Sequence, residues 1–202
     1  MCEHAGVRKS NLIVLLALGA AFTGFVIASI ARDLQGTGSA ADTSVAAGPQ
    51  SATLDWKEKY GSPGQQLLFR VDWLKVVEGG WKARIGITND TTSAYDVGDP
   101  QATLDRSFGL MLFSSSSQSE LDTRSRNGTL PPVREAVQFD PSLPKVMEAG
   151  DSWEGIMSAN GALVAESWAR VVFGALVVIG KPPPGAPTEI VWITDHAHKL
   201  QR

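Results

Sequence analysis

Apolar and polar residues alternate along several short segments of the chain. The first clear segment places on one side Leu67, Phe69, Val71 and Trp73. The next segment places on one side Trp81, Ala83, Ile85 and Ile87, and Glu78-Gly79-Gly80 stands between the two. A period of two residues is typical of a strand with one buried face, and paired glycines are typical of a tight turn. The pattern therefore predicts a β-hairpin.

The same reasoning predicts seven strands, at about 66–77, 81–89, 105–114, 131–139, 146–158, 168–180 and 188–195. Ala169–Ile179 is apolar on both sides, which predicts a central strand with both faces covered. After residue 52, no segment of ten or more residues carries a clean helical period, so the crossover helices of a parallel sheet are missing. The predicted fold class is all-β, an antiparallel β-sandwich of about seven strands. A small closed barrel is the alternative.

A different pattern occupies the start of the chain, where Leu12–Ala31 is an apolar run of 20 residues without a charge. At about 1.5 Å of rise per residue, such a helix spans a hydrocarbon core of roughly 30 Å. Two cations precede the run, whereas Arg32 behind it is offset by Asp33, which predicts a cytoplasmic N-terminus and an exported C-terminal part. A cleaved secretory signal is the alternative, with small residues for the peptidase at Ser29-Ile30-Ala31.

Composition divides the chain into four predicted parts. Residues 1–11 form a cytoplasmic N-terminus, residues 12–31 a transmembrane signal-anchor helix, residues 32–53 a flexible linker and residues 54–202 an exported β-sandwich domain. The linker consists mostly of small and polar residues, which bury too little apolar surface to offset the entropy of ordering. About 150 residues remain for the domain, which suits a single core.

The charge balance and the cysteine content argue against a nucleic-acid-binding protein and against a disulfide-stabilised domain. From residue 52 onward there are fifteen Lys and Arg against eighteen Asp and Glu, a net charge of −3 with both signs interspersed. This balance gives no reason to expect nucleic acid as a partner. The one cysteine is Cys2, so the domain contains no disulfide and is held by its core, to which six tryptophans contribute.

Four segments carry a resemblance to a class of known proteins. They are WKARIGITNDTTSAYDVGD (81–99), FDPSLPKVMEAGDSWEGIMS (139–158), WARVVFGALVV (168–178) and WITDHAHKL (192–200). They resemble membrane-anchored, exported immunoglobulin-like domains of bacteria, in which a strand ends in Thr-Asn, a Pro-Gly or Ala-Gly turn precedes an aromatic strand and a late strand contains Val-Phe-Gly. The resemblance covers about 52–200. It implies an immunoglobulin-like β-sandwich at the cell membrane, and it supplies no catalytic residue.

The strongest candidate for a metal site is the segment Asp195-His196-Ala197-His198. Residues two apart on a strand project to the same face, so both imidazoles could bind one cation. Zinc normally takes three or four protein ligands, and the sequence offers no cysteine or further histidine on this side of the membrane. The alternative to a metal site is the exposed end of a strand without a ligand, and no metal or other cofactor is predicted.

Ser152 is the candidate nucleophile, because Gly150-Asp151-Ser152-Trp153-Glu154-Gly155 is similar to a nucleophile elbow. The second glycine is one position late, however, and no strand-to-helix pattern follows. An alternating strand with Ser152 at its turn explains the same residues without catalysis.

Oxygen-bearing side chains cluster at Asn89, Asp90, Asp96 and Asp99. Their spacing matches no calcium loop, whereas Asn and Asp commonly form turns by bonding their own backbone. The sequence therefore favours a turn over a calcium site.

Two surfaces are candidates for contact with a partner. The polar stretch from Ser114 to Asn127 is predicted to be a surface loop, and its charged residues Glu120, Asp122, Arg124 and Arg126 are the first candidates for protein contact. In the apolar run, Ala20, Gly24 and Ala28 form a stripe of small residues, which would let a second membrane helix approach closely.

Together these features predict a single-pass protein of the cell membrane whose extracytoplasmic domain is a binding or assembly module of the cell envelope. The bilayer and an envelope or membrane protein are the expected partners, and no catalytic activity is expected. The alternative function is an exported hydrolase or metal-binding enzyme that uses Ser152 or His196 and His198. Fold alone does not choose between these, because sandwiches host unrelated functions.

Overall fold

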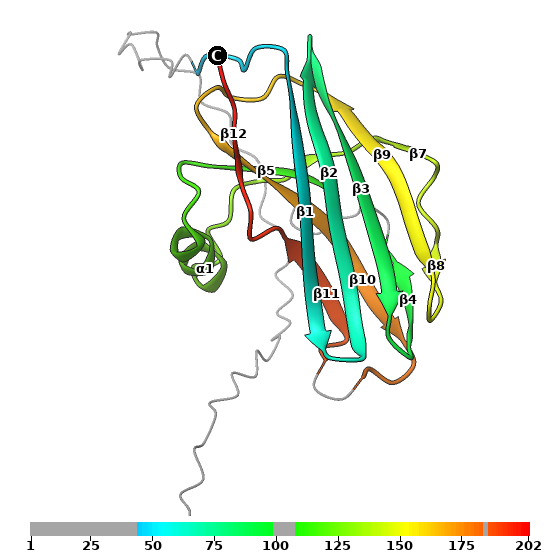
Figure 1. The fold of residues 1–202 in the computed structure, drawn as a ribbon. Helices are drawn as coiled ribbons and strands as arrows, with labels where there is room; N and C mark the ends of the chain where they lie inside the picture. Colours follow the sequence, from blue (N-terminus) through cyan, green and yellow to red (C-terminus); the bar gives the residue numbers. More distant parts are fainter. Residues whose placement is uncertain (1–43, 99–107, 184–185) are drawn as a thin grey trace, which may run out of the picture. The chain divides into compact units, whose positions relative to one another are not determined.

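Two antiparallel β-sheets make up most of the residues that the computed structural model describes, 44–98, 108–183 and 186–202 (Figure 1). The prediction of an all-β fold with two packed sheets is confirmed. The strands are β1 (Gln50–Ser62), β2 (Gln65–Val77), β3 (Gly80–Asp90), β4 (Ala94–Val97), β5 (Gly109–Phe113), β6 (Arg134–Glu135), β7 (Gln138–Asp140), β8 (Val146–Met147), β9 (Ser152–Asn160), β10 (Trp168–Ile179), β11 (Glu189–Ile193) and β12 (His198–Lys199). One helix, α1 (Gln118–Asn127), lies between β5 and β6 in the described sequence.

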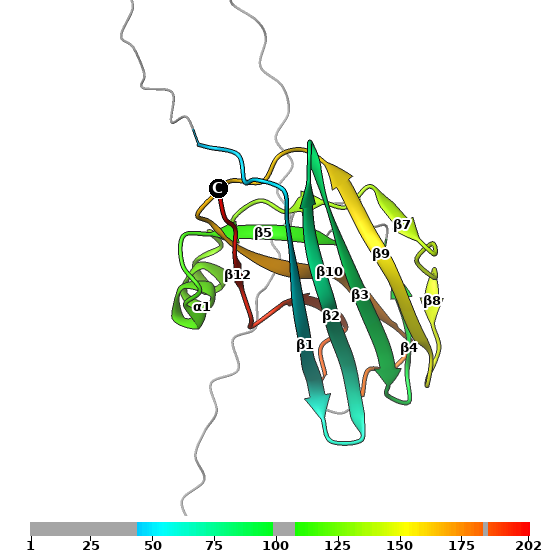
Figure 2. The same cartoon turned by 45° about the horizontal axis from the view of Figure 1, so that its top comes forward.

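The first sheet has the strand order β1-β2-β3-β9-β7 and forms one layer of the sandwich (Figures 1 and 2). Pro63-Gly64 connects β1 to β2, and Glu78-Gly79 connects β2 to β3. Gly64 and Gly79 adopt φ values of 77° and 71°, a region that glycine enters without steric cost. The predicted hairpin of β2 and β3 is therefore confirmed.

The second sheet is built around β10, as its two apolar faces predict. β5 and β4 follow one another along one side of β10, and β11 and β12 pair along the other side. β6 extends the sheet beyond β5, and β8 extends it beyond β4. A strand with neighbours on both sides and cover on both faces needs apolar residues throughout.

The core lies between the inner faces of the two sheets. Its largest side chains with almost no exposure are Trp81, Tyr95, Phe69, Phe108 and Phe173. The rings of Phe69 and Phe173 pack with centroids 4.8 Å apart and join the two sheets. A second apolar cluster covers the other face of the β10 sheet and is made by Met111, Phe113, Leu121, Val133 and Val172.

The count of about seven strands is too low, since the described residues form twelve. The predicted strand 131–139 is divided into β6, which pairs with β5, and β7, which pairs with β9 of the other sheet. The predicted strand 146–158 is divided in the same way into β8 and β9. In both segments the chain crosses from one sheet to the other, which a continuous alternating pattern does not reveal.

Two predicted faces are wrong beyond a β-bulge. In β2 an extra residue at Asp72 shifts the register, so Leu74 rather than Trp73 enters the core. In β10 the pairing with β11 shifts between Phe173 and Leu176, and beyond this shift Val177 and Ile179 are 38% and 49% exposed, so the prediction that both faces are covered fails at this end. A bulge inserts one unpaired residue and reverses the faces of all residues after it.

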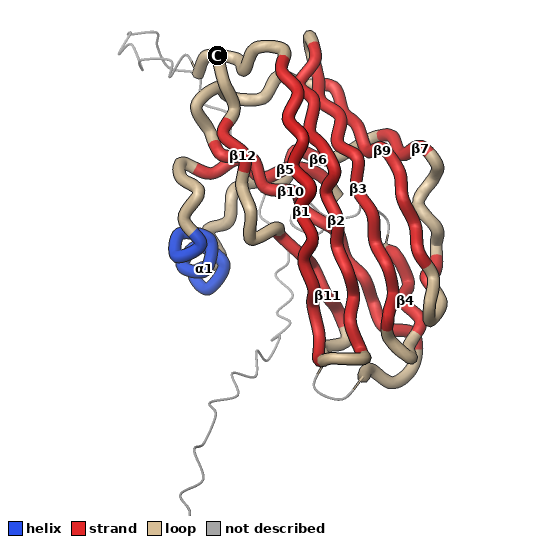
Figure 3. Tube along the Cα trace, in the orientation of Figure 1, coloured by secondary structure: helices blue, strands red, loops and turns tan. Residues whose placement is uncertain are grey.

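The prediction of a surface loop from Ser114 to Asn127 is also wrong, because Gln118–Asn127 is helical (Figure 3). Ser117 is the N-cap, and its side chain accepts a hydrogen bond from the backbone N–H of Glu120. Gly128 ends the helix in the left-handed conformation, with φ of 64°. Leu121 is the helix's buried residue and packs in the second cluster. The sequence Ser-x-x-Glu followed by Gly is the signal that identifies this helix.

The start of the domain and the strand order of the first sheet differ from the predictions. β1 begins at Gln50, so the last residues of the predicted linker belong to a strand. In an immunoglobulin constant-type domain the third strand joins the opposite sheet, whereas β1, β2 and β3 are neighbours here.

Among the described residues no helix has the length and apolarity needed to cross a membrane, and the predicted anchor at 12–31 lies outside them.

Candidate binding groove

A ring of charged side chains crosses the solvent face of β2, β3 and β9. Asp72 pairs with Arg70 at 2.9 Å and with Arg84 at 3.1 Å, and Glu154 pairs with Arg84 at 3.0 Å and also with Arg70. The bulge at Asp72 adds the residue that closes this ring. Isolated surface pairs contribute about 0–1 kcal/mol each, so the main effect of the ring is to hold the two arginines in position.

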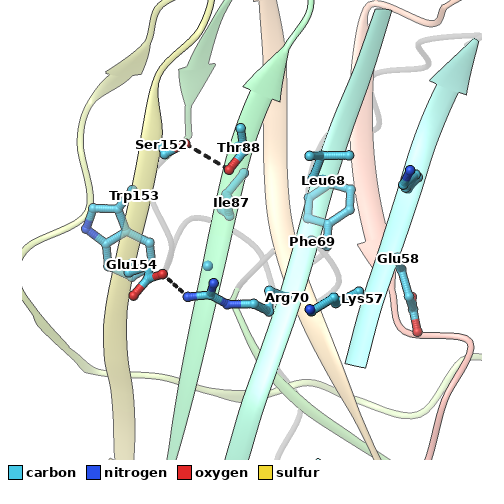
Figure 4. A pocket seen from close by; sticks show the side chains of 12 residues that line it. Lys57, Glu58, Leu68, Phe69, Arg70, Ile87, Thr88, Ser152, Trp153 and Glu154 are labelled. Carbon is cyan, nitrogen blue, oxygen red and sulfur yellow. Dashed lines mark hydrogen bonds and ion pairs between the residues drawn. The ribbon is translucent and has the colours of Figure 1, made fainter. Parts of the chain in front are cut away.

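Beside this ring lies a groove of about 390 Å³ that crosses four strands (Figure 4). Two rows of paired residues border it: Lys59, Leu68, Thr88 and Ser152 in one, and Lys57, Arg70, Gly86 and Glu154 in the other. Gly86 lies within the groove and contributes no side chain. A Cβ at this position would meet the Cγ of Glu154 at 3.4 Å and the Nε of Arg70 at 3.6 Å. Gly86 is buried, and the ion pair of its two cross-strand partners, Arg70 and Glu154, passes over it, so a side chain at this position would displace that pair.

The groove has different chemistry at its two ends. Lys57 and Lys59 lie on β1 with exposed side chains and form no ion pair within the described residues. At the other end, the hydroxyls of Thr88 and Ser152 lie 2.8 Å apart and share a hydrogen bond (Figure 4). Each hydroxyl retains capacity for a further hydrogen bond. The groove therefore offers cations, hydroxyls and the apolar side chain of Leu68 on one rigid sheet.

The segment Asp195-His196 contacts the opposite side of β1, at Glu58. The carboxylate of Glu58 accepts hydrogen bonds from the indole of Trp192 at 2.7 Å and from the backbone N–H groups of Asp195 and His196 at 3.1 and 3.2 Å. The Nδ1 of His196 lies 2.8 Å from the same carboxylate, and its ring stacks on Trp56 with centroids 5.6 Å apart. Glu58 is only 8% exposed, so this cluster fixes the segment to the first sheet.

A buried arginine fixes the same segment from the side of the second sheet. Arg170 donates to the carbonyls of Thr194 and Asp195 at 2.6 Å each, and to the carbonyl of Ser116 at 2.9 Å. Burial lowers the pKa of Arg170 and raises the pKa of Asp195, which the negative charge of Glu58 raises further. The side-chain amide of Gln118 donates to the Asp195 carboxylate at 3.0 Å. These contacts explain the segment by structural anchoring.

The candidate metal ligands do not converge. Among the residues that the structure describes, no group of three His, Cys, Asp or Glu side chains could hold a metal ion. His196 faces Glu58, whereas His198 belongs to β12 and is partly buried, which lowers its pKa. The arrangement gives no support to a metal site at Asp195, His196 and His198.

The candidate nucleophile and its candidate base lie on different faces of the first sheet. Ser152 faces the groove on β9, and its side chain bonds to Thr88. His196 contacts Glu58, whose side chain faces the core side of β1, three strands away in the sheet order. Strands are about 4.8 Å apart, so Ser152 and β1 are separated by roughly 14 Å. The structure forms no serine–histidine pair from these residues.

The charged residues predicted for partner contact form their ion pairs and hydrogen bonds mostly within α1 and the serines just before it. Glu120 pairs with Arg124 at 2.9 Å, and the hydrogen bonds that it accepts from Ser115 and then Ser114 lower its pKa. Arg126 donates to the backbone carbonyl of Asp122 at 3.1 Å. Their exposure still allows a contact, but their interactions are those that a surface helix normally makes.

Asn89 has the structural role that the sequence favours for it. It is fully buried, and its side-chain nitrogen lies within 2.8–3.1 Å of the carbonyl oxygens of Ser93, Met147 and Glu148. Its side-chain oxygen accepts a hydrogen bond from the hydroxyl of Thr91 at 2.8 Å. Asn89 therefore joins the β3–β4 connection to the turn before β9.

The groove residues were not identified from the sequence, although a signal was present. Trp56-Lys57-Glu58-Lys59-Tyr60 alternates in the manner of a strand and places both lysines on one face. Gly86 interrupts the outward row of β3 with a residue that has no side chain. A strand glycine commonly marks a close approach or an open site, and this rule points to the groove.

The described residues define a sandwich-like, mostly β protein with a groove on the solvent face of one sheet. Comparisons of the chain with known protein families, with curated proteins and with solved structures each find no match.

Proposed function

We propose that this chain is a membrane-tethered, extracytoplasmic binding or assembly module of the cell envelope, and that it binds through the groove over Gly86. The observation that carries the proposal is the groove itself, about 390 Å³ in volume and lined from four strands. This volume falls within the range of small-molecule sites. Its lining supplies lysine ammonium groups, two hydroxyls and the apolar side chain of Leu68, which are groups that can recognise a ligand.

The scaffold supports binding because its sheet is held by continuous strand pairing. β2 pairs with β3 from Gln66 to Val77 with one bulge at Asp72, and β9 continues the ladder across nine positions of β3. The inner side chains of these strands belong to the core. A surface of this kind keeps its shape on binding, as in immunoglobulin-like domains, although its strand order is its own.

The proposed membrane location and orientation rest on the amino-acid sequence. The apolar run Leu12–Ala31, the cations before it and the polar stretch after it favour a helix in the bilayer with the domain outside. Ala20, Gly24 and Ala28 remain candidates for helix contact with a membrane protein. If Gly24→Leu leaves crosslinking of the chain in its membrane unchanged, that contact is excluded.

The proposed membrane orientation is tested with the chain's single cysteine. In intact cells, a membrane-impermeant maleimide should leave Cys2 unlabelled and should label a second variant in which Cys2→Ser is combined with Ser125→Cys. Ser125 lies on the exposed side of α1, so its label reports the location of the domain. Labelling of Cys2 without prior lysis contradicts the proposed orientation.

The binding surface is tested by photo-crosslinking of the full chain in its own membrane. A photoreactive amino acid in place of Leu68 should form an adduct, and one in place of Thr53, on the same face but outside the groove, should not. Gly86→Val should abolish the adduct, because its side chain enters the groove and displaces the Arg70–Glu154 pair, whose atoms lie 3.4–3.6 Å from a Cβ at this position. An adduct at residue 68 that persists in Gly86→Val refutes the groove as the binding site, and so does the absence of an adduct.

A further inference from the structure

We infer that the groove binds an anionic saccharide, with a carboxylate or phosphate at the β1 end and sugar hydroxyls at the β9 end. This inference rests on the proposed function, since it names the ligand class of the same groove. It follows from the charge and hydrogen-bonding capacity of the lining, which differ along the groove.

The solvent face of the first sheet is locally cationic on a chain whose net charge is −3. Strands β1, β2, β3 and β9 contribute to this side six cations: Lys57, Lys59, Arg70, Lys75, Lys82 and Arg84. Their carboxylates, apart from the inward Glu58, are Asp55, Asp72, Asp90 and Glu154. The two central carboxylates are occupied by the two arginines, so they do not neutralise the lysines.

Lys57 and Lys59 are placed to bind one anion together. They lie two residues apart on β1 and point to the same face, so their Cα atoms are separated by roughly 7 Å. Both side chains are exposed and both line the groove. An ammonium group has three N–H donors and no acceptor, which suits a carboxylate or phosphate oxygen.

The rest of the groove suits a hydroxylated ligand of small size. Thr88 and Ser152 present two hydroxyls, and each can donate and accept a hydrogen bond. Leu68 provides an apolar surface between the two ends. A sugar ring combines hydroxyls at its rim with apolar C–H faces, so it satisfies both requirements.

Calorimetric titration of the full chain in detergent tests the inference with three probes. These are a disaccharide that ends in glucuronate, glucose 6-phosphate and a neutral disaccharide. We expect at least one anionic probe to bind with a Kd in about the millimolar range or below, and the neutral probe to bind at least about tenfold more weakly. The two anionic probes distinguish a carboxylate from a phosphate as the recognised group.

Paired variants locate the binding. Lys57→Gln combined with Lys59→Gln should weaken the anionic probe at least about tenfold, because two charges near the anion are removed. Lys82→Gln combined with Lys145→Gln removes the same charge outside the groove and should leave the affinity unchanged. Gly86→Val should abolish binding of every probe, and added salt should weaken the anionic probes.

Different results separate the inference from the proposed function. If Gly86→Val abolishes the photo-crosslink but no anionic probe binds, the groove is a binding site and the anionic saccharide is refuted. If an acidic peptide binds and the saccharides do not, the groove is again a binding site and the anionic saccharide is again refuted. If an anionic probe binds equally well to the Lys57→Gln, Lys59→Gln variant and to the parent, the site lies elsewhere and the inference fails.

Discussion

Glu58 provides a demanding test of the structure, because its buried carboxylate joins the first sheet to the segment that contains His196. Glu58→Leu removes the acceptor of the Trp192 indole, of two backbone N–H groups and of the His196 ring. A hydrogen bond to a charged group contributes roughly 1.5–3 kcal/mol. The His196 side chain is 57% exposed and regains water, so most of the loss comes from the Trp192 indole and the two backbone N–H groups, whose bonds are partly buried. We expect unfolding free energy to fall by about 3 kcal/mol.

The assay is urea-induced unfolding of the full chain, followed by tryptophan fluorescence. The midpoint should fall while the dependence on urea concentration stays the same, because the surface exposed on unfolding barely changes. Lys59→Leu, one residue further along β1 with an exposed side chain, is the control and should change stability by no more than about 0.5 kcal/mol. Glu58→Gln retains one carbonyl acceptor and should lose about half as much as Glu58→Leu. A loss below about 1 kcal/mol for Glu58→Leu would show that the cluster does not anchor the segment.

Three further predictions concern the helix and the C-terminal segment. Ser117→Ala should cost about 1 kcal/mol in the same assay, because it removes the N-cap of α1, and an unchanged midpoint would contradict this. Burial, and then the negative charge of Glu58, raises the pKa of Asp195. The native state therefore binds this proton more tightly than the unfolded chain does, so the free energy of unfolding falls as the pH rises through the native pKa. Asp195→Asn should therefore be more stable than the parent at pH 7 and lose this advantage below about pH 4, and equal stability at pH 7 would refute the assignment. Zinc titration should give the same result for the parent and for the variant with His196→Ala and His198→Ala, whereas histidine-dependent binding would revive the metal site.

The site could be predicted only in part. The sequence predicts the strands that carry Thr88 and Ser152, because the alternation in each is clear, but it does not identify either residue as part of a groove. It does not identify Lys57 and Lys59 as their neighbours, since this depends on the pairing of β1 with β2 across the bulge. It also does not predict that His196 meets Glu58, because the two residues are 138 positions apart. Contacts of this kind depend on how the sheets pack.

The sequence by itself determined the all-β class, the hairpin of β2 and β3 and the central position of β10, and it carries the prediction of an apolar anchor before the domain. These features are local, because a period of two residues or a long apolar run is complete within one segment. The tertiary structure decided where strands change sheet, how the bulges reverse the faces of β2 and β10, and which outward residues form the groove. A strand exposes the same backbone groups along its whole length, so its register and partners are set by the fit of side chains from distant segments.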